Sequence, residues 1–241
     1  MRYSPGFLSS TLSSPWTPAD ITTDLWLDAA DTDTITESGG DVSQWDDKSG
    51  NDNHVTQDTG SKQPTTGTRT QNGLNVLDFD GNDEMNKVFA VSQPYSVFAV
   101  AKSDDASGTR FFFGNSDSSP LIYLGHYGSF WRWYVGAQVN GSATDTNYHL
   151  FSAVADGATS ITEMWLDGTS EGTAAGTFDL EGVTIGESSG FWDGTVSEVI
   201  LLGSHPSDAE RQKVEGYLAW KWGTEGNLPV GHPYKNAAPT A

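Results

Sequence analysis

The segment from His126 to Tyr134 holds the residues best suited to bind a ligand, because it combines aromatic rings with a guanidinium group. If it forms a strand, alternate side chains point to opposite faces, so Trp131 and Trp133 share one face while Arg132 and Tyr134 share the other. Sugars stack on flat aromatic faces, and Arg donates hydrogen bonds to hydroxyl groups. The pattern predicts a ligand-binding site formed by His126, Tyr127, Trp131, Arg132, Trp133 and Tyr134. The alternative is that the side chains on one face of the strand belong to the core and those on the other face lie on the sheet surface.

Acidic turns supply the oxygen atoms that a hard cation prefers. Asp80 and Asp83 lie in a Phe-Asp-Gly-Asn-Asp turn, and Asp193 stands at the start of a later strand. Ca²⁺ takes its ligands from carboxylates and loop carbonyls. These residues therefore predict a Ca²⁺ site, with no other cofactor expected. The alternative is that the Asp-Gly pairs serve only as turns.

Catalytic patterns are sparse. Glycoside hydrolysis needs two carboxylates opposed across the scissile bond, whereas Glu198 is the only acid of its apolar strand and Glu163 has Ile161 and Trp165 as same-face neighbours. A lyase base could be assembled from the His126 to Tyr134 residues, but any aromatic-rich sheet offers such a set. No serine-hydrolase elbow, phosphate loop or zinc spacing occurs. The sequence thus favours a non-catalytic protein.

The charge and composition of the chain limit the classes of molecule that it is expected to bind. The chain has 241 residues, no Cys and a formal net charge of −20. Such a field repels phosphate backbones and anionic lipid heads, so neither nucleic acid nor membrane is an expected partner. No apolar run approaches a membrane span, and Met1 to Ser14 lacks the layout of a secretory signal peptide.

Apolar runs separated by Gly-bearing turns predict an all-β fold. The run Tyr95 to Lys102 is apolar on both faces, as expected of a central strand. Asn140-Gly141, Asp156-Gly157, Asp167-Gly168 and Asp193-Gly194 suit hairpin turns between antiparallel strands. Further strands are expected at 25–27, 74–79, 110–113, 121–124, 130–137, 148–155, 161–166, 183–185 and 195–202, with a long structured loop at 42–63.

One helix is predicted at 207–222. Ser207 and Glu210 form a capping box, Val214, Leu218 and Trp222 share one face, and Gly223 supplies the stop. We expect residues 1–20 to form an extended N-terminal arm that either packs on its own sandwich or reaches a neighbouring subunit. Residues 21–241 are expected to form a single jelly-roll sandwich that includes the helix and the C-terminal tail.

Several segments resemble concanavalin A-like, laminin G-like jelly-roll proteins. They are 25–31 (LWLDAAD), 42–51 (VSQWDDKSGN), 78–83 (DFDGND), 148–155, 164–168 and 191–199. The ending at 215–223, with Leu228-Pro229 and His232-Pro233-Tyr234, is similar to that of uncharacterised jelly-roll proteins of tailed phages and aquatic bacteria. The resemblance implies a two-sheet antiparallel sandwich, a ligand site on the concave face or loop rim, and often a bound Ca²⁺.

The resemblance and the missing catalytic pair together predict a non-catalytic virion or particle-surface protein, such as a capsid decoration or a tail- or fibre-associated component. Its expected partners are capsid or tail proteins and further copies of itself, with a homotrimer as the candidate assembly, and its expected location is the particle surface. Two alternatives stay open: a carbohydrate-binding lectin module, and a polysaccharide lyase or glycoside hydrolase.

Overall fold

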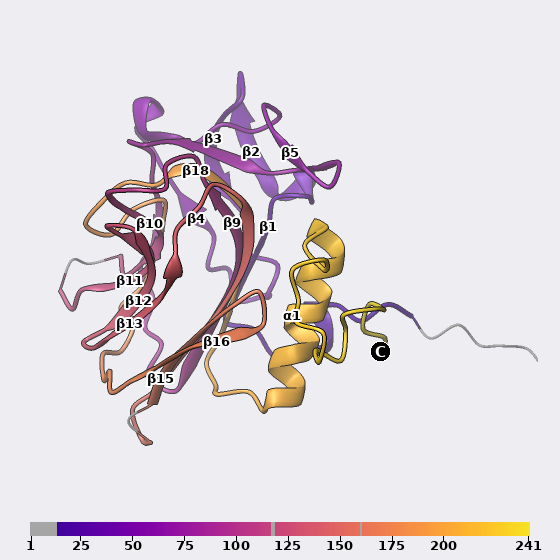
Figure 1. Ribbon diagram of the computed structural model, residues 1–241. Helices are drawn as coiled ribbons and strands as arrows, with labels where there is room; N and C mark the ends of the chain where they lie inside the picture. Colours follow the sequence, from indigo (N-terminus) through magenta and orange to yellow (C-terminus); the bar gives the residue numbers. More distant parts are fainter. Residues whose placement is uncertain (1–13, 117–118, 160) are drawn as a thin grey trace, which may run out of the picture.

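The computed structural model describes residues 14–116, 119–159 and 161–241. Two large antiparallel sheets face each other in a jelly-roll sandwich (Figure 1). The seven-stranded sheet runs in the order β1 (Leu25–Asp28), β18 (Asp193–Leu202), β9 (Tyr95–Ser103), β14 (Tyr148–Asp156), β15 (Ile161–Leu166) and β16 (Thr169–Ala174), and β7 (Leu77–Asp80) also pairs with β18.

The nine-stranded sheet lies opposite. Its order is β13 (Gln138–Ala143), β12 (Phe130–Val135), β11 (Ile122–Tyr127), β10 (Thr109–Gly114), β17 (Val183–Ile185), β8 (Met85–Lys87), β4 (Val55–Thr56), β3 (Asp41–Trp45) and β2 (Ile35–Ser38). A small hairpin joins β5 (Thr70–Gln71) to β6 (Leu74–Asn75), and short 3-10 turns lie at Pro18–Asp20, Thr32–Thr34 and Gly60–Lys62.

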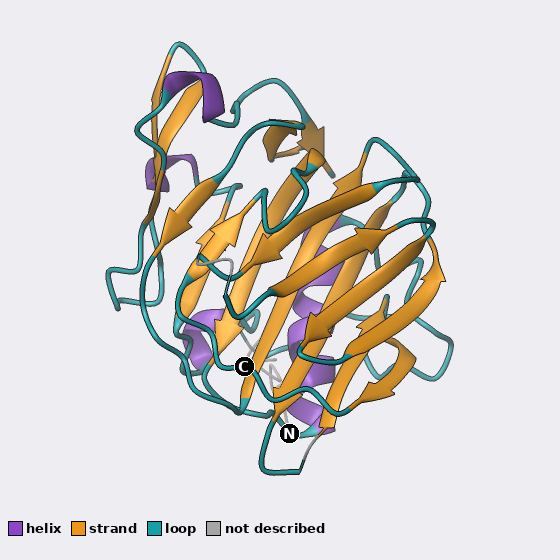
Figure 2. Ribbon diagram, turned by 90° about the vertical axis from the view of Figure 1, so that its left-hand side faces the viewer, coloured by secondary structure: helices purple, strands orange, loops and turns teal. Residues whose placement is uncertain are grey.

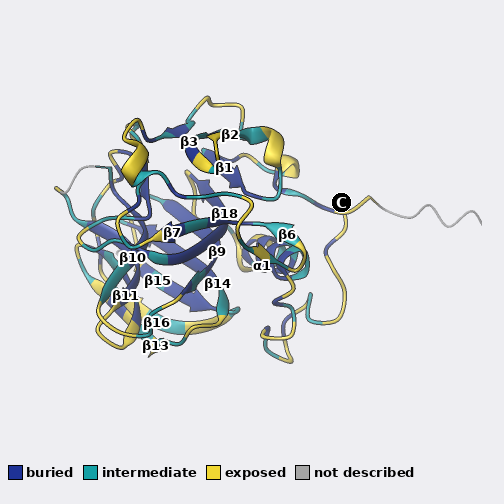
Figure 3. Ribbon diagram, turned by 90° about the horizontal axis from the view of Figure 1, so that it is seen from above, coloured by how far each residue is buried: buried dark blue, intermediate teal, exposed yellow. Residues whose placement is uncertain are grey.

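The central strand β9 is buried on both faces, as its continuous apolar run predicts. Tyr95, Val97 and Ala99 belong to the core between the sheets, whereas Phe98 and Val100 face a second apolar layer. Figure 3 shows β9, β14 and β18 almost entirely buried. A strand covered on both sides does not need alternating polar residues, which explains the sequence.

The second apolar layer lies under helix α1 (Asp208–Trp222), which packs on the outer face of the seven-stranded sheet (Figure 1). Ser207 and Glu210 form the predicted capping box, and Gly223 ends the helix with a φ of 72°. This left-handed conformation favours Gly because it carries no Cβ. Residues Val214, Leu218 and Trp222 pack against apolar side chains of β9, β14 and β18.

The edge of the nine-stranded sheet differs from the sequence prediction. The expected loop at 42–63 contains most of β3 and all of β4. These strands are short, and only Val42, Trp45 and Val55 point into the core, so their apolar pattern is too brief to identify them. The predicted strand at 74–79 is divided between β6 and β7, which belong to different sheets.

Two of the predicted hairpin turns are wrong. Asn140 and Gly141 lie inside β13, and Gly194 lies inside β18. A Cβ on Gly141 would come within 2.6 Å of Met164 Cε, and one on Gly194 within 2.1 Å of the Lys102 carbonyl oxygen. These glycines therefore permit close approach of neighbouring chain segments.

The predicted N-terminal arm lies partly outside the described residues, which begin at position 14. Its described part packs on the same chain: the Trp16 N–H donates to the Pro239 carbonyl, and the Trp16 ring meets Tyr217 edge-on with centroids 5.8 Å apart. The C-terminal tail in turn crosses the helix, where the Trp220 indole N–H donates to the Tyr234 carbonyl. Among the described residues, no helix is long and apolar enough to cross a membrane.

Candidate binding surface

The two tryptophans of the predicted ligand site lie in the core. Trp131 and Trp133 point from β12 into the space between the sheets and are fully buried. Trp133 donates its indole N–H to the Val154 carbonyl at 3.2 Å. His126 on β11 is also buried, between the rings of Trp131 and Trp192. The sequence prediction is therefore wrong for these three side chains, because no ligand outside the sandwich can reach their rings.

The opposite row of the same strands forms an exposed patch. Tyr127 and Phe130 lie opposite each other on β11 and β12, and their side chains are 50% and 51% exposed. Arg132, Tyr134 and Asn140 lie on the same outer face. We call these five residues the outer-face patch. Figure 2 shows this face of the nine-stranded sheet toward the viewer, and none of the helices in the described part of the chain covers it.

The guanidinium group of Arg132 is held in place at the centre of the outer-face patch. It lies 4.3 Å from the centroid of the Tyr127 ring, and its Nε donates to Asn140 Oδ1 at 2.7 Å. The residue opposite Arg132 on β11 is Gly125. A Cβ there would come within 2.2 Å of the Arg110 carbonyl oxygen on β10. The β10 backbone therefore occupies the space that a side chain at position 125 would need.

Stacked rings support the patch from one side. The rings of Tyr123 and Tyr134 are stacked with centroids 5.2 Å apart, and Phe111 stacks on Tyr123 at 3.9 Å. Burial raises the pKa of Tyr123 above its ordinary value, even though the nearby Arg132 charge opposes this. This ladder across three strands fixes the Tyr134 ring before any ligand arrives, which lowers the entropic cost of binding.

The patch offers the chemistry that a neutral sugar needs. Tyr127 and Phe130 present apolar ring surface, while Arg132 has donors beyond the one that Asn140 occupies. It does not form the lyase-type set considered from the sequence. His126 lies on the opposite face of the sheet from Tyr127 and Arg132, so these groups do not converge.

The three aspartates predicted to bind Ca²⁺ meet at one end of the sandwich. Asp193 on β18 pairs with Asp80 on β7, and Asp83 Oδ2 accepts the Asp80 N–H at 2.9 Å. Burial and the neighbouring Asp80 carboxylate raise the pKa of Asp83 to about 7. In the part of the chain that the structure describes, no group of three or more acidic, His or Cys side chains is arranged to hold a metal ion. The Ca²⁺ site stays a prediction.

Sequence reasoning missed Glu187, which lies in the loop between β17 and β18. Burial, together with the charge of Glu84, raises the pKa of Glu187 to about 7. Glu84 itself pairs with Lys62 at 2.6 Å. The two loops that carry these acids are more than 100 positions apart, so only the folded chain brings them together.

Glu198, the acid in the apolar part of β18, has a structural role. It is fully buried between the seven-stranded sheet and α1, where its carboxylate accepts the indole N–H groups of Trp26 and Trp222 and pairs with Lys221. Four hydrogen-bond donors surround it once the Tyr217 hydroxyl is included. A carboxylate so enclosed joins the helix to the sheet and is not available to a substrate.

Comparison with known proteins places the fold among β-sandwich domains. Domain 4 of AbnA, a GH43 extracellular arabinanase from Geobacillus stearothermophilus solved with arabinotriose, is similar over 80% of this chain and 98% of its own, with a TM-score of 0.59 and 10% identity. A Trypanosoma rangeli sialidase solved with sialic acid matches 88% of this chain with a TM-score of 0.58 and 13% identity. An arabinofuranosidase solved with arabinofuranosyl-alpha-1,2-xylobiose matches 80% with a TM-score of 0.53 and 14% identity.

The chain spans 36% of the sialidase and 58% of the arabinofuranosidase, so it corresponds to one part of each. No family model matches the sequence, and no curated protein does. The fold and the exposed patch define a β-sandwich of the jelly-roll type with an uncovered aromatic sheet face. Its structural likeness is to sandwich domains of carbohydrate-processing proteins.

Proposed function

We propose that this protein is a carbohydrate-binding module that holds a neutral sugar chain on the outer-face patch. The observation that carries the proposal is the pair of half-exposed rings, Tyr127 and Phe130, beside the fixed guanidinium of Arg132. They lie on a sheet face that no helix of the described residues covers. Large exposed rings on a rigid sheet bind ligands at low entropic cost, because little has to be ordered. A flat, open surface of this kind suits a polymer rather than a small enclosed substrate.

The charge of the chain supports a neutral glycan, and one of the similar structures was solved with such a sugar. A net charge of −20 disfavours polyanionic ligands at ordinary ionic strength. The arabinanase domain, 98% of which matches 80% of this chain, was solved with arabinotriose. Arabino-oligosaccharides are therefore the first probes to try. A binding module also requires no pair of catalytic carboxylates.

The proposal is tested by glycan-array screening of the purified chain, followed by calorimetric titration with arabinotriose and with the best array ligand. Replacing both rings (Tyr127→Ala with Phe130→Ala) should weaken binding by about a hundredfold, since each stacked ring is worth roughly 1.5 kcal/mol. Val230→Ala is the matched control, because Val230 is also an exposed apolar side chain. Its affinity should equal that of the wild type. Unchanged binding in the double variant, or no ligand on the array, would overturn the proposal.

The particle-surface role predicted from the sequence is compatible with glycan binding, because surface proteins of virions can bind host or environmental sugars. It stays a prediction, together with the laminin G-like relationship to phage proteins, the capsid or tail partners and the homotrimer. Mass spectrometry of a purified particle would test the location, and light scattering would test the assembly.

A further inference from the structure

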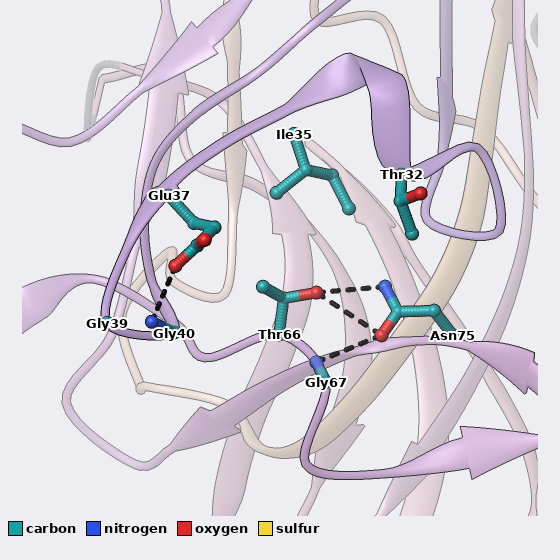
Figure 4. Close-up of a pocket in the computed structure, with 8 residues that line it drawn as sticks. All are labelled: Thr32, Ile35, Glu37, Gly39, Gly40, Thr66, Gly67 and Asn75. Carbon is teal, nitrogen blue, oxygen red and sulfur yellow. Dashed lines mark hydrogen bonds between the residues drawn. The ribbon is translucent and has the colours of Figure 1, made fainter.

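A second surface feature lies at the other end of the nine-stranded sheet. A cleft of about 520 Å³ opens beside the edge strand β2. Its lining residues are Thr32, Ile35, Glu37, Gly39, Gly40, Thr66, Gly67 and Asn75. Figure 4 shows Ile35 and Glu37 on one wall, facing Thr66 and Asn75 across the opening. Its volume falls in the range of small-molecule sites, roughly 300 to 1,000 Å³.

Internal hydrogen bonds hold the polar walls of this cleft in position. Glu37 Oε2 accepts the Gly40 N–H at 2.6 Å, which fixes the carboxylate at the turn between β2 and β3. Asn75 Oδ1 accepts the Gly67 N–H at 3.0 Å, and its amide group donates to the Thr66 hydroxyl and to the Ala29 carbonyl. The walls are therefore built before any ligand binds.

The lining is rich in acceptors and carries no cationic side chain. The Glu37 carboxylate and the Thr32 side chain line the opening together with the apolar side chain of Ile35, whereas the Thr66 hydroxyl is directed at Asn75. A carboxylate has two oxygens and about four acceptor sites, so one bond to Gly40 leaves capacity for a ligand's donors. Vicinal hydroxyl groups supply such donors, and the C–H face of a sugar ring can lie against Ile35. An anionic ligand would be repelled by Glu37.

The cleft is separate from the outer-face patch. The patch lies on β11 to β13, and the cleft lies beside β2 at the opposite edge of the same sheet. Seven strand spacings separate β12 from β2, which corresponds to roughly 34 Å along the sheet at about 4.8 Å per spacing. One mono- or disaccharide cannot reach both, whereas a polymer can.

We propose that the cleft beside β2 is a second sugar-binding site, which takes a single neutral sugar unit through two neighbouring hydroxyl groups on Glu37. This inference rests on the proposed function for its ligand class, but the site and its residues are independent of the patch. A polysaccharide that occupies both sites gains affinity through effective concentration.

The test is ligand-detected NMR by saturation transfer, with the methyl glycosides of arabinose, galactose and glucose as probes and ethylammonium as a cationic probe. The proteins are the wild type, Glu37→Gln, Thr32→Trp to fill the cleft, and the double variant Tyr127→Ala with Phe130→Ala. Glu37→Gln and Thr32→Trp are also combined with this double variant. Glu181→Gln is the matched control, since it removes the same charge from an exposed position on another loop. Urea unfolding checks that each variant is folded.

With both sites present, the double variant should reduce the sugar signal, and Glu181→Gln should leave it unchanged. In the double-variant background, Glu37→Gln should weaken the remaining signal about tenfold and Thr32→Trp should abolish it. A sugar signal that depends only on Tyr127 and Phe130 would overturn the cleft proposal and leave the proposed function intact. A Glu37-dependent signal with no effect of the double variant would support the cleft and overturn the patch. Glu37-dependent binding of ethylammonium alone, or no signal at all, would overturn the cleft as a sugar site.

Discussion

Glu198 Oε2 on β18 accepts the indole N–H of Trp222 on α1 at 2.7 Å, in a fully buried contact between the sheet and the only α-helix of the described residues. The same carboxylate accepts the Trp26 indole N–H at 2.7 Å and pairs with Lys221 at 2.7 Å. One acidic side chain thus links two strands and the helix, although it stands alone in the sequence.

Removing this carboxylate should destabilise the protein strongly. Glu198→Ala leaves two buried indole donors without their partner, although Lys221 still pairs with Asp28 at 2.6 Å. We expect it to lower the free energy of unfolding by roughly 3 kcal/mol. Urea unfolding followed by circular dichroism measures the change. Glu181→Ala is the control, because an exposed acid should change stability by less than about 0.5 kcal/mol. Equal effects of the two variants would show that the buried network is not stabilising.

The inward-facing and outward-facing side chains of β11 and β12 should respond differently to truncation. Trp131→Ala and Trp133→Ala each remove a fully buried indole, and each should cost roughly 3 to 5 kcal/mol of stability. Tyr127→Ala removes a ring that is half exposed and should cost less than about 1 kcal/mol. Urea midpoints of the three variants provide the measurement. If the tryptophan variants were as stable as Tyr127→Ala, the assignment of rows to core and surface would be wrong.

His149 should make stability depend on pH. Its Nδ1 lies 2.6 Å from Asp167 Oδ2 and its Nε2 lies 2.9 Å from Asp145 Oδ1. Burial lowers the pKa of His149, but the two carboxylates outweigh burial and raise it above the ordinary value. The resulting stabilisation is complete below the unfolded pKa of about 6.5 and is lost as pH rises through the folded pKa.

The matching variant is His149→Asn. Its loss of stability relative to the wild type should be largest near pH 6 and should shrink toward pH 9, as measured by urea midpoints across this range. The comparison with the wild type at each pH cancels contributions from other groups. A difference that stays constant from pH 6 to pH 9 would contradict a charged His149 in the folded state.

Asp83 should also stabilise the folded protein more at low pH than at high pH, and its effect should fall in a lower pH range than that of His149. Because its folded pKa is raised to about 7, its favourable contribution is complete below the unfolded pKa of about 3.9 and is lost as pH rises through the folded value. Asp83→Asn can still accept the Asp80 N–H but cannot ionise. The variant should therefore be more stable than the wild type by on the order of 2 kcal/mol at pH 8, with little gain near pH 4. Thermal unfolding at both pH values checks this.

The predicted Ca²⁺ site shares these residues and has its own test. If Asp80, Asp83 and Asp193 bind Ca²⁺, the cation must displace the Asp83 proton, so added CaCl₂ should raise the Tm more at pH 8 than at pH 6. Asp193→Asn should remove that response, and MgCl₂ serves as the ion control. If neither CaCl₂ nor a chelator changes the Tm at pH 8, the site does not exist.

The sequence alone predicted the antiparallel sandwich and the helix, because both depend on local signals. The apolar run of β9, the alternation in β12 and the capping box at Ser207 each need only neighbouring residues. The short edge strands β3 and β4 escaped prediction since each offers too few apolar positions to show a period.

The alternation of side chains along a strand correctly divided the aromatic segment 126–134 into two faces. Only the tertiary structure decided which of these faces points into the core. A period of two separates the faces of a strand without saying which face a second sheet will cover. The packing of β9 and β14 against β12 buried Trp131 and Trp133 and left Tyr127 and Phe130 outside. Contacts between distant segments, such as those around Glu198 and the hydrogen bond from the Thr66 N–H to the Gly40 carbonyl beside the cleft, likewise arise only when the chain is folded.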